Sequence, residues 1–351
     1  MPNGKRDMSD SLGMASELAG QALRAGWYFA LNRVVDWRTL RLGMARRYRP
    51  SRPVPSLQEL LADQARLVID DALAVRNRLC PPMEGPSTPL LHLERVGRML
   101  ADLPEALTRR ASADATTAKA EAAAAAVPPY YAQDFHFQTG GYLSERSASL
   151  YDVQVETLFM GAAAPMRRAA LRAVCRHMRG RDQRKMSLLD AACGTGRFLR
   201  QVRLALPAIG LKGIDLSRAY LQEARGHLAG LRGAELIEAA AEHMPLADAS
   251  VDIVTAIFLY HELPPEVRRE VTAESARVLK PGGLFVFLDS LQIGDRPGWD
   301  GLLEGFPVRF HEPFYRHYVI DDLEGMFSEA GLAAQSTSTP FLSKLMVRRK
   351  R

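Results

Sequence analysis

Short apolar runs alternate with helix-like segments across residues 187–289, and this alternation constrains the fold more than any other feature of the chain. The apolar runs read SLLDAA, LKGIDL, AELIEAA, VDIVTAIF and GLFVFLD. Segments such as RFLRQVRLAL and EVRREVTAESARVL lie between them and have helical spacing. Such alternation is typical of an α/β fold, in which helices cover a mainly parallel, doubly wound sheet.

The first of these runs ends in LLDAACGTGRF, where two glycines follow an aspartate. Gly194 and Gly196 allow a tight turn and let a ligand approach the backbone closely. In an open parallel sheet, ligands bind outside the carboxyl ends of the strands, where this turn falls. Asp215 ends the next run, about 20 residues later, where a carboxylate can accept hydrogen bonds from ribose hydroxyls. We therefore expect a ligand that carries a ribose.

Two features separate the possible ribose-containing ligands. A dinucleotide fingerprint needs a third glycine, and Leu199 stands at that position. Asp190 precedes the glycines, and its carboxylate would repel a pyrophosphate but attract a sulfonium and an ammonium group. Both features favour S-adenosylmethionine over a dinucleotide.

With these motifs, residues 130–351 resemble the class I S-adenosylmethionine-dependent methyltransferases. LLDAACGTGR corresponds to the first motif and GIDLS to the second. AAAEHMPLADASVDIVTAIFLYHELP corresponds to the third and fourth, and RVLKPGGLFVFLDS to the stretch after them. The resemblance implies a Rossmann-like sheet of seven strands with the last strand antiparallel. AAQSTSTPFLSKLMVRRKR would supply the terminal strands.

The resemblance also implies which residues contact the cofactor. They are Asp190, Ala192, Gly194 and Gly196 around the methionine part, Asp215 at the ribose, Leu216, Ala241 and Glu242 at the adenine, and Phe258 near the methyl group.

The chain departs from the family pattern at two positions, and two of the implied contacts have simpler alternatives. Ala192 replaces a frequent glycine, which we take as a mild change, and Ala240 replaces a frequent aspartate. An adenine contact is therefore either missing or supplied by Glu242. Taken alone, Phe258 also suits the core, and Asp215 also suits a helix N-cap.

The catalytic candidates lie in FLYHELP, directly after the fourth predicted strand. Methyl transfer needs a base only if the acceptor must lose a proton. His261 has an intrinsic pKa suited to a base near neutrality, and Glu262 could orient it or hold a cationic amine. The alternative is that His261 caps the next helix or packs against the turn.

Two aromatic segments are candidates for the substrate wall, YYAQDFHFQTGGYLS at 130–144 and FPVRFHEPFYRHY at 306–318. Aromatic walls suit flat or apolar substrates, although the same residues could simply pack a lid onto the domain. The candidate residues are His136, Gln138, Tyr142, His311, Glu312, Tyr315 and Tyr318.

An alanine-rich segment at 111–129 predicts a partly helical linker between a helical N-terminal domain at 1–110 and the methyltransferase domain at 130–351. In the N-terminal domain, Leu23, Trp27, Leu31 and Val34 recur at helical spacing and are predicted to form the core of a small bundle. The alternative is an amphipathic surface that touches a membrane or a partner, because arginines flank the aromatic residues.

Composition adds few constraints. The net charge of +6 permits nucleic acid, an anionic membrane or an acidic substrate, but no nucleic-acid-binding motif is visible. Three widely spaced cysteines indicate neither a disulfide framework nor a zinc site, and we expect no metal. The most apolar early run, AGWYFAL, is far shorter than the roughly 20 residues that span a bilayer. We expect a cytoplasmic protein, with peripheral membrane contact through its N-terminal helices as an alternative.

The sequence thus predicts a methyltransferase that acts on a small, apolar or aromatic molecule such as a lipid, a quinone or a secondary metabolite. One alternative is methylation of RNA or protein through the basic surface. Another is a non-catalytic, cofactor-binding regulatory subunit whose N-terminal helices contact a partner.

Overall fold

The computed structural model describes residues 3–44, 48–84, 88–112, 118, 127–137 and 140–351. Its centre is a seven-stranded sheet with the order β3-β2-β1-β4-β5-β7-β6, in which β7 runs antiparallel to both neighbours. The predicted α/β class and the antiparallel last strand are confirmed. The strands are β1 Ser187–Ala191, β2 Gly210–Asp215, β3 Glu235–Glu238, β4 Val251–Ile257, β5 Leu279–Ser290, β6 Leu332–Ser338 and β7 Ser343–Lys350.

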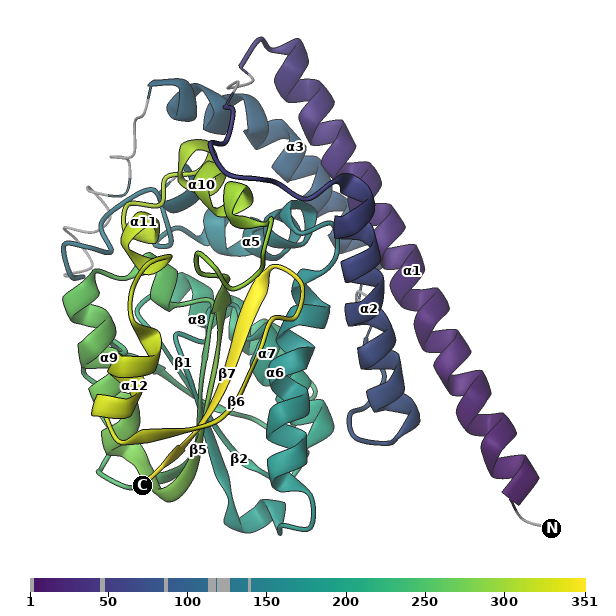
Figure 1. The fold of residues 1–351 in the computed structure, drawn as a ribbon, viewed down its shortest axis with the longest axis vertical. Coiled ribbons are helices and arrows are strands. Elements are labelled where there is room, and N and C mark those ends of the chain that lie inside the picture. Colours follow the sequence, from purple (N-terminus) through teal and green to yellow (C-terminus); the bar gives the residue numbers. More distant parts are fainter. Residues whose placement is uncertain (1–2, 45–47, 85–87, 113–117, 119–126, 138–139) are drawn as a thin grey trace.

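Helices cover both faces of the sheet, with α6 and α7 on one side and α9 and α12 on the other (Figure 1). The helices are α1 Asn3–Arg41, α2 Leu57–Arg76, α3 Pro89–Ser112, η1 Phe135–Phe137, α5 Glu145–Leu158, α6 Ala163–Met178, η2 Gln183–Lys185, α7 Arg197–Ala205, α8 Arg218–Leu228, η3 Tyr260–Glu262, α9 Pro265–Val278, α10 Asp300–Arg309, α11 Tyr315–Tyr318 and α12 Leu323–Glu329. Because both faces are covered, the central strands are almost entirely buried and apolar.

The register of the central strands places polar residues at one edge of the sheet. Asp190 of β1 lies opposite Gly213 of β2 and Thr255 of β4. The parallel strands β1, β2 and β4 therefore end side by side, and the loops that follow them meet at their carboxyl ends. This edge carries the site described below.

The N-terminal helices pack onto the α/β region through a face that differs from the predicted one. Leu23, Trp27 and Val34 of α1 are 77%, 43% and 40% exposed, so the predicted bundle core is wrong for these residues. Leu31 is buried as predicted, and Tyr28 is buried in place of Trp27. Their apolar cluster includes residues of α3 and α5, namely Val96, Met99, Leu150 and Val153. The buried face of α1 was mispredicted because this helix buries only a narrow stripe of side chains.

A buried ionic network joins α1 and α2 to α6. Asp71 of α2 is fully buried, and it accepts hydrogen bonds from Arg168 Nε at 2.6 Å and Arg172 Nη1 at 3.1 Å. Gln21 of α1 donates to the same carboxylate at 2.8 Å. Removing one partner from such a network typically costs about 3–5 kcal/mol, so these contacts hold α2 firmly against the α/β region.

The predicted linker at 111–129 falls mostly outside the described residues. α3 runs to Ser112, and Ala118 is buried, with its backbone N–H donating to Asp134 Oδ1 at 2.8 Å. Within the described parts of the chain, no helix has both the length and the apolar character needed to cross a bilayer.

Candidate functional site

A pocket opens at the carboxyl ends of β1, β2 and β4, where the sequence predicts the cofactor site. Gly196 does not line this pocket. The other predicted cofactor residues do, namely Asp190, Ala192, Gly194, Asp215, Leu216, Ala241, Glu242 and Phe258.

The turn after β1 contains three residues with left-handed backbone. The φ angles of Ala192, Gly194 and Gly196 are 56°, 55° and 73°. A Cβ at Gly196 would lie 2.7 Å from the Cβ of Ala224, so this glycine allows α8 to pack closely. Gly194 has open space where a Cβ would lie, which suits close approach of a ligand. The left-handed φ of Ala192 costs about 1–2 kcal/mol relative to glycine.

Two buried carboxylates flank this turn. Asp190 Oδ1 accepts a hydrogen bond from Thr255 Oγ1 at 2.6 Å. Asp215 accepts from the backbone N–H groups of Gly194 and Ser217, each at 2.8 Å. Ser217 itself caps α8, so the N-cap alternative for Asp215 is wrong. Each carboxylate keeps further lone pairs that can accept hydrogen bonds from a ligand.

Burial makes both carboxylates easier to protonate. Burial, reinforced by the nearby charge of Asp215 and opposed by the Thr255 hydrogen bond, raises the pKa of Asp190 to about 8. Burial likewise raises the pKa of Asp215 to about 6, against its two backbone hydrogen bonds. A cationic ligand would favour the charged forms, so this pair of acceptors fits the sulfonium, ammonium and ribose groups of S-adenosylmethionine.

At the predicted adenine position, Glu242 lines the pocket and is nearly buried. Its Oε1 accepts a hydrogen bond from Tyr130 Oη at 2.5 Å. The pocket therefore has a carboxylate in this region although Ala240 lacks one.

Phe258 lies at the end of β4 with a φ of 56°, which is strained for a bulky side chain. Its backbone N–H donates to Leu288 O at 2.7 Å, and its ring stacks on Phe159 with the centroids 6.2 Å apart. Strain of this kind is concentrated at functional sites. Because Phe258 also lines the pocket, its ring is available to a ligand.

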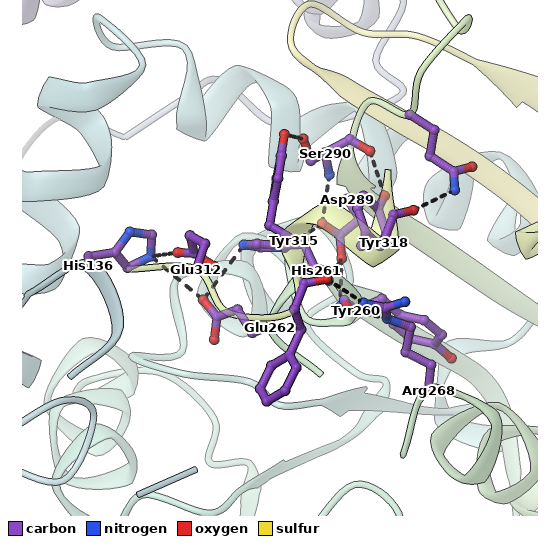
Figure 2. Close-up of polar contacts among 12 residues, drawn as sticks. His136, Tyr260, His261, Glu262, Arg268, Asp289, Ser290, Glu312, Tyr315 and Tyr318 are labelled. Atoms are coloured by element: carbon purple, nitrogen blue, oxygen red, sulfur yellow. Dashed lines mark hydrogen bonds and ion pairs between the residues drawn. The ribbon is translucent and has the colours of Figure 1, made fainter. Parts of the chain in front are cut away.

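The two catalytic candidates have different surroundings (Figure 2). His261 is buried behind the pocket wall, and its Nδ1 lies 2.6 Å from Asp289 Oδ1. Burial alone would lower its pKa, but Asp289, Glu262 and Glu312 together raise that pKa to about 10. Asp289 holds the ring, and His261 does not line the pocket, so this geometry argues against His261 as the base.

Glu262, in contrast, lines the pocket. Its Oε1 accepts a hydrogen bond from Tyr142 Oη at 2.5 Å. The Nε2 atoms of His136 and His261 each lie 3.7 Å from the same oxygen. Glu262 is thus the candidate catalytic group that faces a bound ligand.

The substrate-wall candidates divide into those at the pocket and those behind it. Tyr142 lines the pocket, and His136 lies beside Glu262 without lining it. Tyr315 and Tyr318 are wrong as pocket residues, because they are buried in the core and hydrogen-bond through their hydroxyls to Oγ and O of Ser290, respectively, at 2.7 and 2.6 Å.

The remaining wall candidates contact neighbouring segments. His311 Nε2 lies 2.9 Å from Gln133 Oε1 and is not among the pocket residues. The Glu312 side chain is fully buried, and burial raises its pKa to about 7. Gln138 lies outside the described residues.

Sequence reasoning missed several pocket residues. Tyr130, Tyr131 and Phe135 belong to the aromatic segment already singled out, so its composition was a usable indication. Thr195 and Arg197 lie within the motif LLDAACGTGR, which was likewise an indication, whereas Tyr151, Arg167 and Tyr220 occur in ordinary helical patterns and had none.

Comparison with known proteins agrees with this geometry. Residues 188–283 match a family described as a methyltransferase domain. The chain is 33% identical over 152 residues to the ubiquinone/menaquinone biosynthesis C-methyltransferase of Syntrophotalea carbinolica, covering 43% of this chain and 60% of the relative. It is 30% identical over 174 residues to the demethylmenaquinone methyltransferase of Listeria monocytogenes, covering 44% and 72%.

A third relative is the phthiotriol/phenolphthiotriol dimycocerosates methyltransferase 1 of Mycobacterium ulcerans, with 31% identity over 124 residues, 35% of this chain and 44% of that protein. The chain thus spans roughly half the length of several relatives that it matches. A solved S-adenosylmethionine-dependent methyltransferase from Aquifex aeolicus aligns with a TM-score of 0.37 and 18% identity, over 47% of this chain and 82% of that one.

Proposed function

The chain belongs to the class I S-adenosylmethionine-dependent methyltransferases, and we propose that it methylates a small apolar or aromatic molecule of the lipid or quinone type. One observation carries this proposal: two unlike sets of side chains, here called walls, line a single pocket. Carboxylates beside a glycine turn form one wall. Aromatic rings form much of the other, namely Tyr131, Phe135, Tyr142, Tyr151 and Tyr220.

The carboxylate wall is the proposed cofactor side. S-adenosylmethionine would supply an electrophilic methyl group there. Asp190 is placed to offset the positive charge of the cofactor, and Asp215 to accept hydrogen bonds from its ribose hydroxyls. Arg167 and Arg197 also line the pocket and could bind the carboxylate of the methionine part.

The aromatic wall is the proposed acceptor side. The ring of Tyr142 lies 5.3 Å from that of Phe135 and 5.4 Å from that of Tyr220, centroid to centroid. Such a wall favours flat or apolar molecules and excludes water. Orientation of the acceptor would supply much of the rate, because the methyl donor is intrinsically reactive.

Glu262 replaces His261 as the proposed polar contact to the acceptor. It faces the pocket, whereas His261 lies behind it and hydrogen-bonds to Asp289. In this proposal Glu262 holds an acceptor hydroxyl or takes its proton, and His261 positions the Glu262 carboxylate. The relatives named for ubiquinone, menaquinone and phthiotriol methylation support an acceptor of this class.

The test is transfer of labelled methyl groups. We would incubate the purified chain with methyl-labelled S-adenosylmethionine and a cell extract that has been separated into lipid, polar small-molecule, RNA and protein fractions. Label in the lipid fraction is expected, and Asp215→Ala should abolish it. Label confined to RNA or protein would overturn the acceptor class, and cofactor binding without any transfer would favour the regulatory alternative.

We further propose that α1 contacts a membrane or an apolar partner from which such an acceptor is delivered. Trp27, Trp37 and Leu40 are exposed on α1, and Arg41 lies over the Trp37 ring at 4.5 Å. Exposed aromatic residues beside arginines are typical of interfacial helices. Flotation with anionic vesicles should carry the protein upward, and Trp37→Ser together with Leu40→Ser should reduce that fraction.

A further inference from the structure

Three potential metal-ligating side chains from distant parts of the chain converge behind the acceptor wall (Figure 2). His136 comes from η1, Glu262 from η3, and Glu312 from the segment between α10 and α11. One donor atom from each lies within 4.8 Å of the donors of the other two. A nitrogen and two carboxylate oxygens thus face a common point.

Within this cluster, Glu312 is the residue whose surroundings indicate a ligand. Its side chain is 0% exposed, and within the described residues neither carboxylate oxygen accepts a hydrogen bond. His136 Nε2 lies 3.1 Å from Oε1, but not in hydrogen-bonding geometry. A buried carboxylate without hydrogen bonds is costly, so a further cation at this point would stabilise it.

The distances suit a small ion with little rearrangement. Metal bonds of about 2.0–2.2 Å to nitrogen and oxygen place neighbouring donors about 3.0–3.5 Å apart. The separations of His136 Nε2 from Glu312 and from Glu262 are 3.1 Å and 3.7 Å. The Glu262 and Glu312 oxygens lie within 4.8 Å of each other, so Glu262 would move toward the other two donors when an ion binds.

His261 has the arrangement of a further ligand. Its Nδ1 lies 2.6 Å from Asp289, and its Nε2 points toward Glu262 at 3.7 Å. Metal-binding histidines commonly donate one ring N–H to a carboxylate, which fixes the other nitrogen toward the metal. Figure 2 shows the rings of His136 and His261 pointing toward the two glutamates from different sides.

We propose that His136, Glu262 and Glu312 bind a divalent first-row transition-metal ion, with His261 able to complete the coordination. Imidazole and carboxylate donors together suit Mn²⁺, Fe²⁺, Co²⁺ or Zn²⁺ better than an all-oxygen site for Mg²⁺ would. Because Glu262 also lines the pocket, the ion would hold the Glu262 carboxylate in place on the acceptor side. That role rests on the proposed function, whereas metal binding itself does not.

The experiment uses Co²⁺ as a spectroscopic probe. Tag-free protein is stripped with EDTA, dialysed and titrated with Co²⁺ while the visible d–d absorption is recorded. One equivalent is expected to bind, and Zn²⁺ should displace it. Glu312→Gln keeps the shape of the side chain but removes its charge, and should weaken binding at least tenfold. Glu266→Gln, at an exposed glutamate on α9, is the matched control and should bind as the wild type does.

Each contrary result is decisive. If the wild type binds no Co²⁺, or if Glu312→Gln binds it equally well, the site does not exist as described. Circular dichroism and cofactor binding will verify that Glu312→Gln is folded, and His136→Gln provides a second variant with the same expected loss. Since the readout is metal absorption, failure of methyl transfer would leave this result unaffected, and absence of metal would not contradict methyl transfer.

Discussion

The carboxylate wall with its glycine turn (the turn wall) is built differently from the cluster of His136, Glu262 and Glu312 (the ion cluster). The turn wall draws mainly on the loops after β1, β2 and β4, whose positions follow directly from strand register. The cluster brings together His136, Glu262 and Glu312, which only tertiary packing places within reach of one another. Local backbone geometry therefore defines the cofactor side, and long-range packing defines the acceptor side. Substitutions should separate the two.

The largest expected effect is at Asp215. Asp215→Ala removes the ribose acceptor and the hydrogen bond that Asp215 accepts from Gly194 N–H, and should weaken S-adenosylmethionine binding at least about 100-fold. Calorimetry measures this directly. Glu312→Gln is the matched test on the other side and should leave cofactor affinity within about twofold. Equal losses in both variants would mean that the two sides are not separable.

A smaller effect is expected at Glu262. Glu262→Gln should lower kcat about 100-fold, because a positioned carboxylate is lost from the acceptor side, while cofactor affinity stays nearly unchanged. Rates with the acceptor found in the labelling experiment would measure this. His261→Asn should have a weaker effect, since His261 does not line the pocket. The opposite ranking would restore His261 as the base.

The pH dependence of cofactor binding tests the carboxylate wall more finely. Burial raises the pKa of Asp190 to about 8, so this carboxyl is mostly neutral at pH 6 when no cation is bound. A bound cation favours its charged form, so binding releases a proton. Affinity should therefore rise by up to about tenfold per pH unit between pH 6, below which Asp215 titrates as well, and pH 8, and level off above pH 8. Titration of the cofactor itself affects the wild type and Asp190→Asn equally, but Asp190→Asn should lack the slope that comes from Asp190. An equal slope in both proteins would assign that slope to another group.

Much of the fold and of the turn wall could be predicted from the sequence, because both depend on local patterns. Strand–helix alternation is sufficient to predict the sheet, and residues that follow strand ends must meet at one edge. The phase of α1 could not be predicted, because a long helix with apolar residues on several faces does not indicate which stripe a neighbour covers. Tyr28 rather than Trp27 is buried there.

The acceptor side was predictable only as a composition. The aromatic segments were identified, but nothing local distinguishes Tyr142, which reaches the pocket, from Tyr315, which fills the core. The proposed roles of Glu262 and His261 differ from the predicted ones for a related reason. The adjacent side chains leave η3 in different directions, and the partner that fixes His261 is Asp289 of β5.

The smallest expected effect, at Ala192, tests whether the turn wall is determined by its local backbone. Ala192 has left-handed φ, so glycine there should relieve about 1–2 kcal/mol of strain and lose about 0.5–1 kcal/mol to the greater freedom of the unfolded chain. Ala192→Gly should thus raise the free energy of unfolding by roughly 0.5–1 kcal/mol, measured by chemical denaturation.

Ala191→Gly is the matched control, because Ala191 is buried in β1 and glycine weakens a strand. It should lower the free energy of unfolding by about 1 kcal/mol or somewhat more. Opposite signs at adjacent alanines would show that backbone conformation sets the shape of the turn. If Ala192→Gly were destabilising as well, packing of the alanine methyl group would have to stabilise the fold by more than the left-handed backbone of Ala192 costs. The turn wall would then depend on tertiary contacts, as the ion cluster does.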